Sequence, residues 1–543
     1  MKLSKLLESI IPQQVRGITL TSDPEPVSIS CALPIRLNPD PEISSLHLNS
    51  REVRPGGLFV AVPGLKVDGH EYIDSAVIRG AAAVISQKPV ALNVWNIEVE
   101  NSRKALAALS SQFYGNPSEK MKIIGITGTN GKTTTAFIIE KILLQAGFSA
   151  GVIGTLNYRY CGKVFDVSMT TPESLDLQRI LSDMLSEGVT HVVMEASSHA
   201  IFLNRIDACW MDVAVFTNLT QDHLDFHGNM EDYWQSKKKL FTEHLAKGPK
   251  KDKAIAVINC NDPQGKRLFK ELPSALSVGF DDHCQLWPEI IRKDQAGMKG
   301  VISTPEGMFK FETPLIGKYN VENILCAAGA CLALGLPLNI IRSGIESVEF
   351  VPGRLQSIPN VVDRFVFVDF AHTPDALENV LHTLRTLTTD RIICVFGCGG
   401  DRDREKRPLM GHIAASLANI CIITSDNPRF EDPVTIIEDI LAGVRMQGLQ
   451  PYNPDDAIKL PSARGYFVES DRSRAIEMAI RISRHWDMIL ITGKGHETYQ
   501  IIGNQKVPFD DRLIARKALE LIEKQDFRNI IGKRSCSEVQ TGQ

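Results

Sequence analysis

The sequence has no excess of positive charge and no apolar run long enough to span a membrane. Its 60 Lys and Arg residues face 64 Asp and Glu residues, which gives a net charge of −4. Such a balance does not indicate a nucleic-acid partner. The N-terminal run MKLSKLLESIIPQQ also lacks the apolar core and cleavage site of a signal peptide. We therefore expect a cytoplasmic protein without a membrane span.

Paired cysteine motifs are missing as well. The 11 cysteines are an odd number and are scattered without Cys-x-x-Cys spacing, which favours reduced thiols over disulfides or a zinc site. Hydrophobic residues make up 43% of the chain and charged residues 23%, as in soluble globular proteins. A chain of 543 residues is long enough for roughly three domains.

A phosphate-binding pattern is present near residue 130. An apolar run suited to a buried strand, Lys122 to Ile126, precedes a segment with helical apolar spacing, Lys132 to Ala146. Between them a glycine-rich turn opens the helix, so its backbone N–H groups can bind phosphate. The residues expected to bind ATP are Thr127, Gly128, Thr129, Asn130, Gly131, Lys132, Thr133 and Thr134.

Within this turn, Lys132 is expected to reach the terminal phosphates and Thr133 to hold Mg2+. The pattern is a variant, because the strict P-loop has a glycine where this chain has Ile126. The alternative is a strand-turn-helix with a chance Gly-Lys-Thr, which the buried strand before it makes improbable.

Two later strands of the central region also end in groups suited to a metal. Glu195 follows the apolar run 191–194, and His223 follows a strand predicted at 213–216. Both would lie at the carboxyl edge of an open, largely parallel sheet, where ligands collect. A carboxylate there suits Mg2+, and His223 is a candidate second ligand. A histidine that only makes a structural hydrogen bond is the alternative.

The remaining segments on either side predict further α/β units. Before residue 117, short strands and polar turns indicate a small α/β unit. After residue 350, apolar strands at 365–368, 392–396, 421–424 and 488–492 each end in a polar loop, which predicts a second doubly wound domain. The stretch 526–543 is polar and aperiodic, and we expect a loose tail.

Seven motifs together resemble the ATP-dependent Mur ligase family, and they occur in the family's order: TGTNGKTTT, MEASSHA, FTNLTQDHLDFHG, DFAHTPDAL, FGCGGDRDREKRPLMG, DNPR and GKGHE. The resemblance implies an α/β protein of three domains. These are a small UDP-binding unit (1–117), a central P-loop ATPase with a mostly parallel sheet (118–350), and a C-terminal Rossmann-like domain that carries an amino acid (351–525).

The resemblance also implies roles for individual residues. Contacts to UDP are expected from Leu48, Ser50, Leu65, Lys66 and Val67, and contacts to a muramoyl peptide from Thr170, Thr171, Ser197 and Arg205. Asn323, Arg354, Asp369 and His372 resemble residues near the nucleotide. The chain departs from the family at Met169 and Leu203, where an asparagine and a glutamine are common, so contacts from those two side chains are not expected.

One lysine has a special implied role. Lys237 lies four residues after Tyr233, the spacing at which the family carries a lysine carbamylated by CO2, and the modified side chain would be an anionic Mg2+ ligand. A run of three lysines is otherwise typical of a solvated helix face, and Lys238 and Lys239 are expected to face solvent.

The amino acid implied is meso-2,6-diaminopimelate. Its contacts are expected from Arg402, Asp426, Asn427, Pro428, Arg429, Gly493 and Glu497, with the arginine fork of Arg429 on the carboxylate that lysine lacks. The implied reaction consumes ATP with Mg2+ and joins this amino acid to a UDP-linked muramoyl dipeptide through an acyl phosphate. Such an enzyme needs no protein nucleophile, and a monomer is expected.

Three alternatives remain open at this point. A ligase of the same family could add L-lysine instead, or the chain could be a folylpolyglutamate synthase-like ligase. The third is a nucleotide-switched binding protein that uses hydrolysis only for conformational signalling.

Overall fold

The computed structural model describes residues 1–10, 14–16, 37–64, 67–90, 93–167, 169–453 and 464–524. The chain divides into two compact units. The first contains Met1–Leu219, His227–Leu286 and Leu325–Gly344, and the second contains Thr220–Phe226, Trp287–Ile324 and Ile345–Gln543. The boundaries expected at residues 117, 350 and 525 are not tested by this division and stay a prediction. The expected tail at 526–543 lies outside the described residues.

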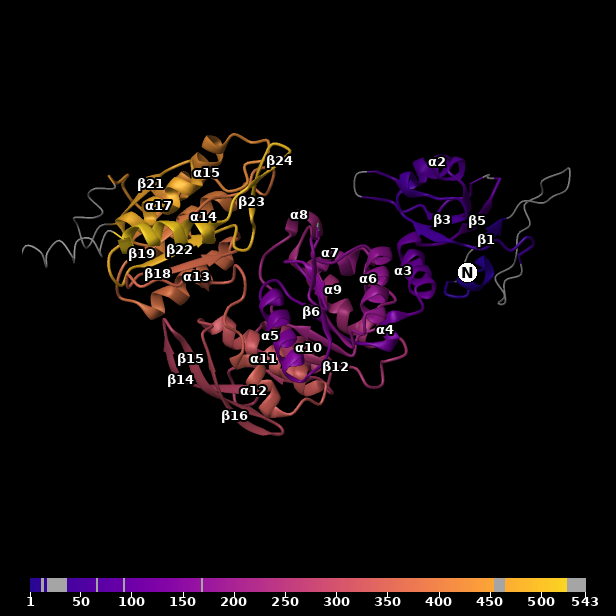
Figure 1. Cartoon of the computed structure of the whole chain (residues 1–543), viewed down its shortest axis with the longest axis horizontal. Helices are drawn as coiled ribbons and strands as arrows, with labels where there is room; N and C mark the ends of the chain where they lie inside the picture. Colours follow the sequence, from indigo (N-terminus) through magenta and orange to yellow (C-terminus); the bar gives the residue numbers. More distant parts are fainter. Residues whose placement is uncertain are drawn as a thin grey trace, which may run out of the picture. The chain divides into compact units, whose positions relative to one another are not determined.

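The N-terminal part of the first unit is a three-layer α/β structure. Its five-stranded sheet has the order β1-β5-β4-β3-β2, in which only β1 is antiparallel to its neighbour. Apolar side chains of α1 and α3 pack on one face, and those of α2 pack on the other (Figure 1). The elements are α1 Leu3–Leu7, β1 Gln14–Arg16, β2 Ser45–His47, η1 Ser50–Glu52, β3 Gly57–Val60, η2 Gly69–Tyr72, α2 Ile73–Ile78, β4 Ala81–Ser86, β5 Trp95–Glu98 and α3 Ser102–Phe113.

The first unit is built around an eight-stranded sheet with the order β13-β12-β11-β6-β10-β7-β8-β9. Six neighbouring strands are parallel, namely β13, β12, β11, β6, β10 and β7, whereas β8 and β9 form an antiparallel extension. On β6, Ile123, Ile124 and Ile126 are fully buried, as expected for a parallel strand covered on both faces. The strands are β6 Lys122–Thr127, β7 Ala150–Ile153, β8 Tyr158–Tyr160, β9 Lys163–Phe165, β10 His191–Glu195, β11 Val213–Phe216, β12 Ile255–Asn259 and β13 Leu276–Val278.

Helices cover this sheet and connect its strands. They are α4 Pro117–Lys120, α5 Lys132–Gln145, α6 Ser174–Ser186, α7 Ser198–Phe202, α8 Leu224–His227, α9 Met230–Lys239, η3 Leu240–Leu245, α10 Pro263–Glu271, α11 Lys318–Ala333 and α12 Leu338–Glu346. Side chains of α6, α9 and α10 belong to one continuous core with Ile123 of β6 and Phe216 of β11. The helix predicted at residues 132–146 is therefore confirmed as α5, which directly follows the phosphate-binding turn.

The sequence did not predict a three-stranded antiparallel sheet. Its strands are β14 Trp287–Asp294, β15 Gly297–Thr304 and β16 Gly307–Thr313. The strand-helix alternation expected between 118 and 350 is interrupted here, and Figure 1 shows the three strands side by side. Alternating burial along β16 indicates that one face is covered and the other is exposed.

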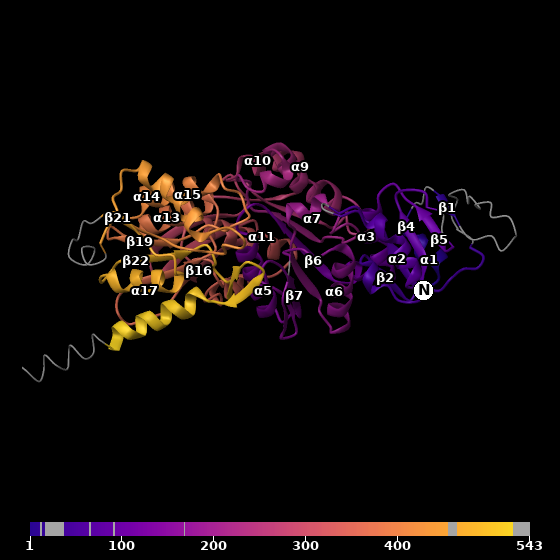
Figure 2. The same ribbon diagram turned by 90° about the horizontal axis from the view of Figure 1, so that it is seen from above.

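The second unit contains a six-stranded sheet with the order β17-β18-β22-β19-β20-β21. Apolar residues of α13, α14 and α15 pack on one face, and those of α17 and of the helix at 511–524 pack on the other (Figure 2). The elements are β17 Gln356–Ser357, β18 Phe365–Asp369, α13 Pro374–Leu387, β19 Ile392–Phe396, α14 Lys406–Leu417, β20 Ile420–Ile423, α15 Pro433–Met446, β21 Gly465–Val468, α17 Arg472–Ile482, β22 Met488–Thr492, β23 Tyr499–Ile502 and β24 Gln505–Pro508.

This arrangement confirms the doubly wound domain expected after residue 350. The four predicted apolar strands are β18, β19, β20 and β22, and these are parallel and adjacent in the sheet. Their polar loops therefore meet at one edge. In the part of the chain that the structure describes, no helix has the length and apolarity needed to cross a membrane.

Candidate active site

The phosphate-binding turn between β6 and α5 is held by the segment that follows β11. Asn218 accepts hydrogen bonds from the Thr129 amide at its backbone oxygen (2.9 Å) and from the Asn130 amide at Oδ1 (2.8 Å). The Thr217 hydroxyl donates to the Asn130 carbonyl (2.7 Å). These bonds fix the turn at the positive end of α5, where backbone N–H groups can bind phosphate.

Two glycines make this turn possible. Gly128 has φ +150°, and a Cβ atom there would lie 1.8 Å from the Thr217 hydroxyl. Gly131 has φ 87° and directly precedes α5. A side chain at either position would be strained or would collide, so the glycines are required by the approach of the β11 segment and by the entry into the helix.

Two lysines converge on the carbonyl of Gly128. The Lys132 ammonium donates to Gly128 O (2.9 Å) and to Thr129 O (2.7 Å), and the Lys237 ammonium donates to Gly128 O (2.7 Å). Lys132 therefore lies along the turn, in reach of any phosphate bound there. Both side chains were predicted to take part in the site, and the structure brings them together.

Lys237 is buried, although it belongs to a run of three lysines. Its side chain is 1% exposed, and its Nζ lies 4.3 Å from the centre of the Tyr233 ring. The Tyr233 hydroxyl in turn lies 3.1 Å from the Thr129 hydroxyl. Lys238 instead pairs with Glu271 (2.6 Å). The reading of this run as a solvated helix face is therefore wrong for Lys237.

Glu195 lies at the end of β10, beside Thr133, and is 2% exposed. Its Oε2 accepts from the Thr133 hydroxyl (3.1 Å), and its carboxylate also accepts from the Thr155 amide (3.0 Å) and hydroxyl (2.9 Å). A Cβ at Gly154 would lie 2.4 Å from Glu195 Oε1. A buried carboxylate and a hydroxyl at the phosphate-binding turn are oxygen ligands that fit Mg2+.

The residues expected to hold the muramoyl peptide lie next to Glu195 in the same hydrogen-bond network. The Thr171 hydroxyl donates to the Glu195 carbonyl (2.7 Å) and to Ser197 Oγ (3.2 Å). Ser197 also accepts from the Ala200 amide and so caps α7. The Thr170 hydroxyl lies 3.2 Å from that of Thr155. The structure thus brings both threonines and Ser197 next to the candidate metal ligands.

Arg205 forms an ion pair with a residue that the sequence did not single out. Its Nε lies 2.8 Å from Glu173 Oε1, and the Arg103 guanidinium donates to Glu173 Oε2 at 3.4 Å. Burial lowers the pKa of Arg103. Arg205 Nη1 also lies 3.2 Å from the sulfur of Met169, so the methionine contacts the arginine at a position where the family often has an amide.

Of the residues expected to contact UDP, Ser50 is buried and begins η1 directly after β2. Leu48 is half-buried, and Val67 is 51% exposed. Leu65 and Lys66 lie outside the described residues. The structure therefore leaves their expected role as a prediction.

In the second unit, Asp369 ends β18 and is buried. Its Oδ1 accepts from the Ala371 amide (2.7 Å), and its Oδ2 accepts from the Leu355 amide. Burial raises the pKa of Asp369, and the nearby Arg354 acts in the opposite direction. The Arg354 guanidinium lies over the Phe370 ring at 4.7 Å from its centre. These residues form one cluster at the strand end, and their expected contact with the nucleotide stays a prediction.

Three other predicted residues of the second unit lie in different surroundings. His372 is exposed, with its Nδ1 bound to the Phe370 carbonyl (2.8 Å). Asn323 is buried in α11 and donates to Asn320 Oδ1 (3.1 Å). His223 lies on an exposed loop with φ 55°, and its Nε2 is 3.3 Å from the Asp222 carboxylate. Its role as a metal ligand stays a prediction.

The loops after β19 and β20 bring two arginines together. A Cβ at Gly399 would lie 2.9 Å from Arg429 Nη1 and 3.7 Å from Arg402 Cγ. Arg429 Nη1 also donates to the Gly400 carbonyl (2.8 Å). Burial lowers the pKa of Arg429, and the like charge of Arg402 adds to this effect. Two neighbouring guanidinium groups form a site suited to a carboxylate.

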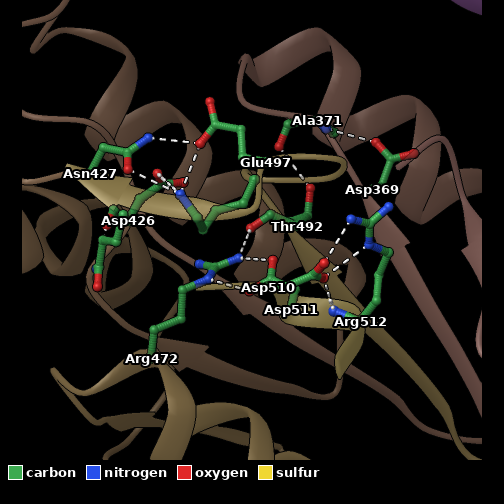
Figure 3. A network of polar contacts seen from close by, with 12 residues as sticks. Asp369, Ala371, Asp426, Asn427, Arg472, Thr492, Glu497, Asp510, Asp511 and Arg512 are labelled. Atoms are coloured by element: carbon green, nitrogen blue, oxygen red, sulfur yellow. Dashed lines mark hydrogen bonds and ion pairs between the residues drawn. The ribbon is translucent and has the colours of Figure 1, made fainter. Parts of the chain in front are cut away.

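The loops after β20 and β22 are joined by a buried polar cluster (Figure 3). Lys494 donates to Asn427 Oδ1 (3.0 Å) and to Glu497 Oε2 (2.8 Å), and Asn427 Nδ2 donates to the same Glu497 oxygen (2.9 Å). Gly493 has φ 114°, and a Cβ there would lie 2.4 Å from Asp426 Oδ2. The predicted residues of both loops, with Pro428 between Asn427 and Arg429, therefore share one edge of the sheet.

Several residues that hold these groups were not predicted. They are Glu173, Asn218, Thr155, Lys494 and Arg407. Arg407 is fully buried and donates to Glu431 (2.9 Å) and Asp439 (2.9 Å), while Glu431 accepts from the Asp401 amide next to Arg402. Asn218, Lys494 and Arg407 lie inside motifs that the sequence displays, but spacing alone does not show what they contact.

Three family models match the chain. The Mur ligase middle domain matches residues 126–331, the glutamate ligase domain of Mur ligases matches 353–495, and the catalytic domain of the Mur ligase family matches 42–114. The second unit's candidate amino-acid loops thus fall largely within the glutamate ligase domain model.

Named relatives agree with these matches. The chain is 46% identical over 474 residues to a UDP-N-acetylmuramoyl-L-alanyl-D-glutamate–2,6-diaminopimelate ligase of Geobacter metallireducens, covering 87% of this chain and 93% of the relative. A solved structure with the same ligase name has a TM-score of 0.65 at 30% identity, covering 90% of this chain and 98% of that one. A MurF ligase from Thermotoga maritima in complex with ADP has the same fold, with a TM-score of 0.58 at 21% identity over 88% of this chain and 98% of its own. The chain belongs to the Mur ligase family.

Proposed function

We propose that this ligase adds meso-2,6-diaminopimelate to UDP-N-acetylmuramoyl-L-alanyl-D-glutamate, with consumption of ATP, in the synthesis of peptidoglycan precursors. The observation that carries the proposal is the pair of arginines around Gly399. Arg429 contacts the Asn427 carbonyl (3.5 Å), and the Asn427 side chain donates to the Glu497 carboxylate. Diaminopimelate has two carboxylates and two amino groups, whereas lysine has one carboxylate. The names of the relatives support the same substrate.

The first chemical step is phosphoryl transfer to the substrate. A carboxylate oxygen of the dipeptide attacks the γ-phosphorus of ATP, the bond from that phosphorus to the bridging oxygen breaks, and ADP leaves. The backbone amides of the turn and the Lys132 ammonium hold the phosphates, because two anions must meet in this step. Thr171, Ser197 and Arg205 hold the peptide next to Glu195.

The second step forms the amide bond. The neutral amine of diaminopimelate attacks the acyl carbon, the bond from that carbon to the phosphate oxygen breaks, and the nitrogen loses a proton. In this proposal Arg402 and Arg429 bind a carboxylate and Glu497 binds an ammonium. The three side chains fix the orientation of the amino acid and so the choice of amine.

Thr133 and Glu195 would hold Mg2+ through a hydroxyl and a carboxylate oxygen, and His223 is a further candidate ligand. When bound, this ion would neutralise charge on the phosphates. Lys237 would join the ligands after carbamylation, in which its neutral amine forms a bond to the carbon of CO2 and one proton is released. The buried position of Lys237 beside the phosphate-binding turn supports this role.

The proposal is tested by the release of ADP in the presence of different substrates. We expect release only when ATP, the UDP-linked dipeptide and diaminopimelate are all present, with much slower turnover when L-lysine replaces diaminopimelate. A folylpolyglutamate synthase would need a folate instead, and a nucleotide-switched binding protein would need neither substrate. Equal ligation of L-lysine would contradict the proposed amino acid. A cytoplasmic location is part of the proposal, because ATP and UDP-linked precursors are cytoplasmic compounds. We also propose that the ligase acts as a monomer.

A further inference from the structure

Lys494 is a buried cation for which the proposed mechanism has no use. Its side chain is fully buried directly after β22. Its ammonium donates to Asn427 Oδ1 (3.0 Å) and Glu497 Oε2 (2.8 Å), and Asp426 Oδ1 lies 4.0 Å away. A charge is costly to bury unless it is paired and hydrogen-bonded. The burial of Lys494 therefore depends on the side chains of these two loops.

The partners of Lys494 are the side chains expected to contact the amino acid. Glu497 Oε2 accepts two hydrogen bonds, one from Lys494 and one from Asn427 Nδ2 (2.9 Å). Asn427 is itself fixed, because its Oδ1 also accepts from the Ile501 amide (2.9 Å). Among the described residues, none forms a hydrogen bond or an ion pair with Glu497 Oε1. One oxygen of this carboxylate is held, and the other is available.

We infer that Lys494 is a positioning residue for the amino-acid substrate, which holds Glu497 so that Oε1 meets the substrate ammonium. The inference rests on the proposed function. Lys494 acts through Glu497, which it holds together with Asn427, and does not itself touch the substrate. Its ammonium also lies 4.0 Å from Asp426 Oδ1, so the two carboxylates of this buried cluster share one cation.

Other charged groups face the same cluster from neighbouring elements. They are Arg429 and Arg472, whose charges act on Asp426 and Glu497. His496 also faces Lys494, but burial lowers the pKa of its imidazole to about 3, so it carries no charge near pH 7. Arg472 is paired with Asp511 (2.8 and 2.7 Å) and donates to the Thr492 carbonyl (3.0 Å). Of the cations in this group, Lys494 is the one that donates directly to Glu497.

The test replaces Lys494 by methionine, which keeps most of the side-chain volume and removes the charge. We expect the KM for diaminopimelate to rise about tenfold or more, since Glu497 loses a charged hydrogen bond and its fixed orientation. The KM values for ATP and the UDP-linked dipeptide should change less than about twofold, because no group of the phosphate loop is altered. The matched control is Lys506→Met, which removes a lysine from the exposed strand β24.

The split between KM and kcat separates positioning from a general structural effect. In Lys494→Met the Glu497 carboxylate loses the cation that donates to it. The KM for diaminopimelate should therefore rise, while kcat at saturating diaminopimelate changes little. An unchanged KM for diaminopimelate, or an equal rise in all three KM values, would overturn the inference.

A double variant covers the case in which Lys494→Met does not fold. Lys494→Met/Glu497→Gln removes both charges of the pair and is compared with Glu497→Gln alone. If Lys494 acts through Glu497, the two should have the same KM for diaminopimelate. A further tenfold rise in the double variant would contradict the inference. If the wild type fails to ligate diaminopimelate at all, the proposed function fails, whereas normal wild-type ligation with an unchanged Lys494→Met refutes only the role of Lys494.

Discussion

The phosphate-binding turn of the first unit and the amino-acid loops of the second unit both follow parallel strands, but they are built from different atoms. The turn presents backbone amides and is shaped by Gly128, Gly131 and the Asn218 segment. The amino-acid loops present the charged side chains of Arg402, Arg429 and Glu497. A backbone site can bind any phosphate group of suitable shape, whereas the arrangement of side-chain charges decides which amino acid fits.

The largest loss of activity is expected when a positive charge is removed from the phosphate-binding turn. Lys132→Ala should reduce ligation by roughly two or more orders of magnitude, because it removes the cation that stabilises the charge of phosphoryl transfer. Steady-state rates of ADP formation measure this loss. Near-normal activity in the folded variant would end the assignment of the turn as an ATP site. Lys141→Ala, on the helix α5 that follows, is the matched control.

Lys237→Ala should come next and be nearly inactive, because it would remove the proposed anionic metal ligand. A small carboxylic acid added to the assay should restore part of the rate, since it can supply the anionic oxygen of the carbamate. Lys239→Ala, on the same helix, should stay near the wild-type rate. Full activity of Lys237→Ala would remove the residue from the site.

Arg429→Ala tests the loops of the second unit, which present charged side chains. We expect the KM for diaminopimelate to rise by about a hundredfold, because the arginine fork that binds the distal carboxylate is lost. The KM values for ATP and the UDP-linked dipeptide should barely change, since the other site is intact. If all three KM values rise together, Arg429 stabilises the fold and does not bind the substrate.

Changing a candidate metal ligand should have a smaller effect, which is a higher requirement for Mg2+. Glu195→Gln should need about tenfold more Mg2+ for half-maximal rate, because an amide oxygen is a weaker ligand than a carboxylate. His223→Ala is predicted to change in the same direction. Titration of activity with MgCl2 measures both. An unchanged requirement in both variants would leave these residues with structural roles only.

The smallest expected effect concerns stability. Hydrogen bonds from Arg407 lower the pKa of Glu431 to about 2 from its ordinary 4.5. A lowered folded-state pKa means that this stabilisation is present above pH 4.5 and is lost as the pH falls through about 2. Glu431→Gln should therefore destabilise the protein by about 1–3 kcal/mol near pH 7, and the difference from the wild type should shrink toward pH 2.

Denaturant unfolding followed at several pH values measures this difference. Glu438→Gln is the matched control, because its carboxylate pairs with Arg445 while both side chains are largely exposed. A destabilisation of Glu431→Gln that stays constant down to pH 2 would show that the charge of Glu431 is not its source.

The two sites also differ in how far the sequence predicts them. The turn at 127–134 was predicted almost completely, because one short segment carries both the strand and the helix entry. Asp369, Asn427 and Glu497 were predicted to lie at one sheet edge, which the parallel order of β18, β22, β19 and β20 explains. Lys494 and Arg407 were missed as supports, since Asn427 lies far from Lys494 along the chain, as Glu431 and Asp439 do from Arg407.

The antiparallel strands β14 to β16 were missed for another reason. Their burial alternates or is low, as on β14, where several side chains are exposed. Such strands lack the continuous apolar run that marked β6 or β19. Glu173 was missed because an ion pair with Arg205 and Arg103 depends on three separate segments, which no local pattern brings together.

The shared carbonyl of Gly128 has a consequence for how the enzyme responds to dissolved CO2. Lys132 and Lys237 both donate to this one oxygen, at 2.9 and 2.7 Å, and two ammonium groups that share an acceptor repel each other. The proposed carbamylation would reverse the sign of Lys237 and turn this repulsion into attraction. The charge at residue 132 and the affinity of residue 237 for CO2 would then be thermodynamically linked. The carbamylated fraction of the enzyme would rise with the CO2 concentration, and the Lys132 cation would shift the concentration at which half of the enzyme is carbamylated.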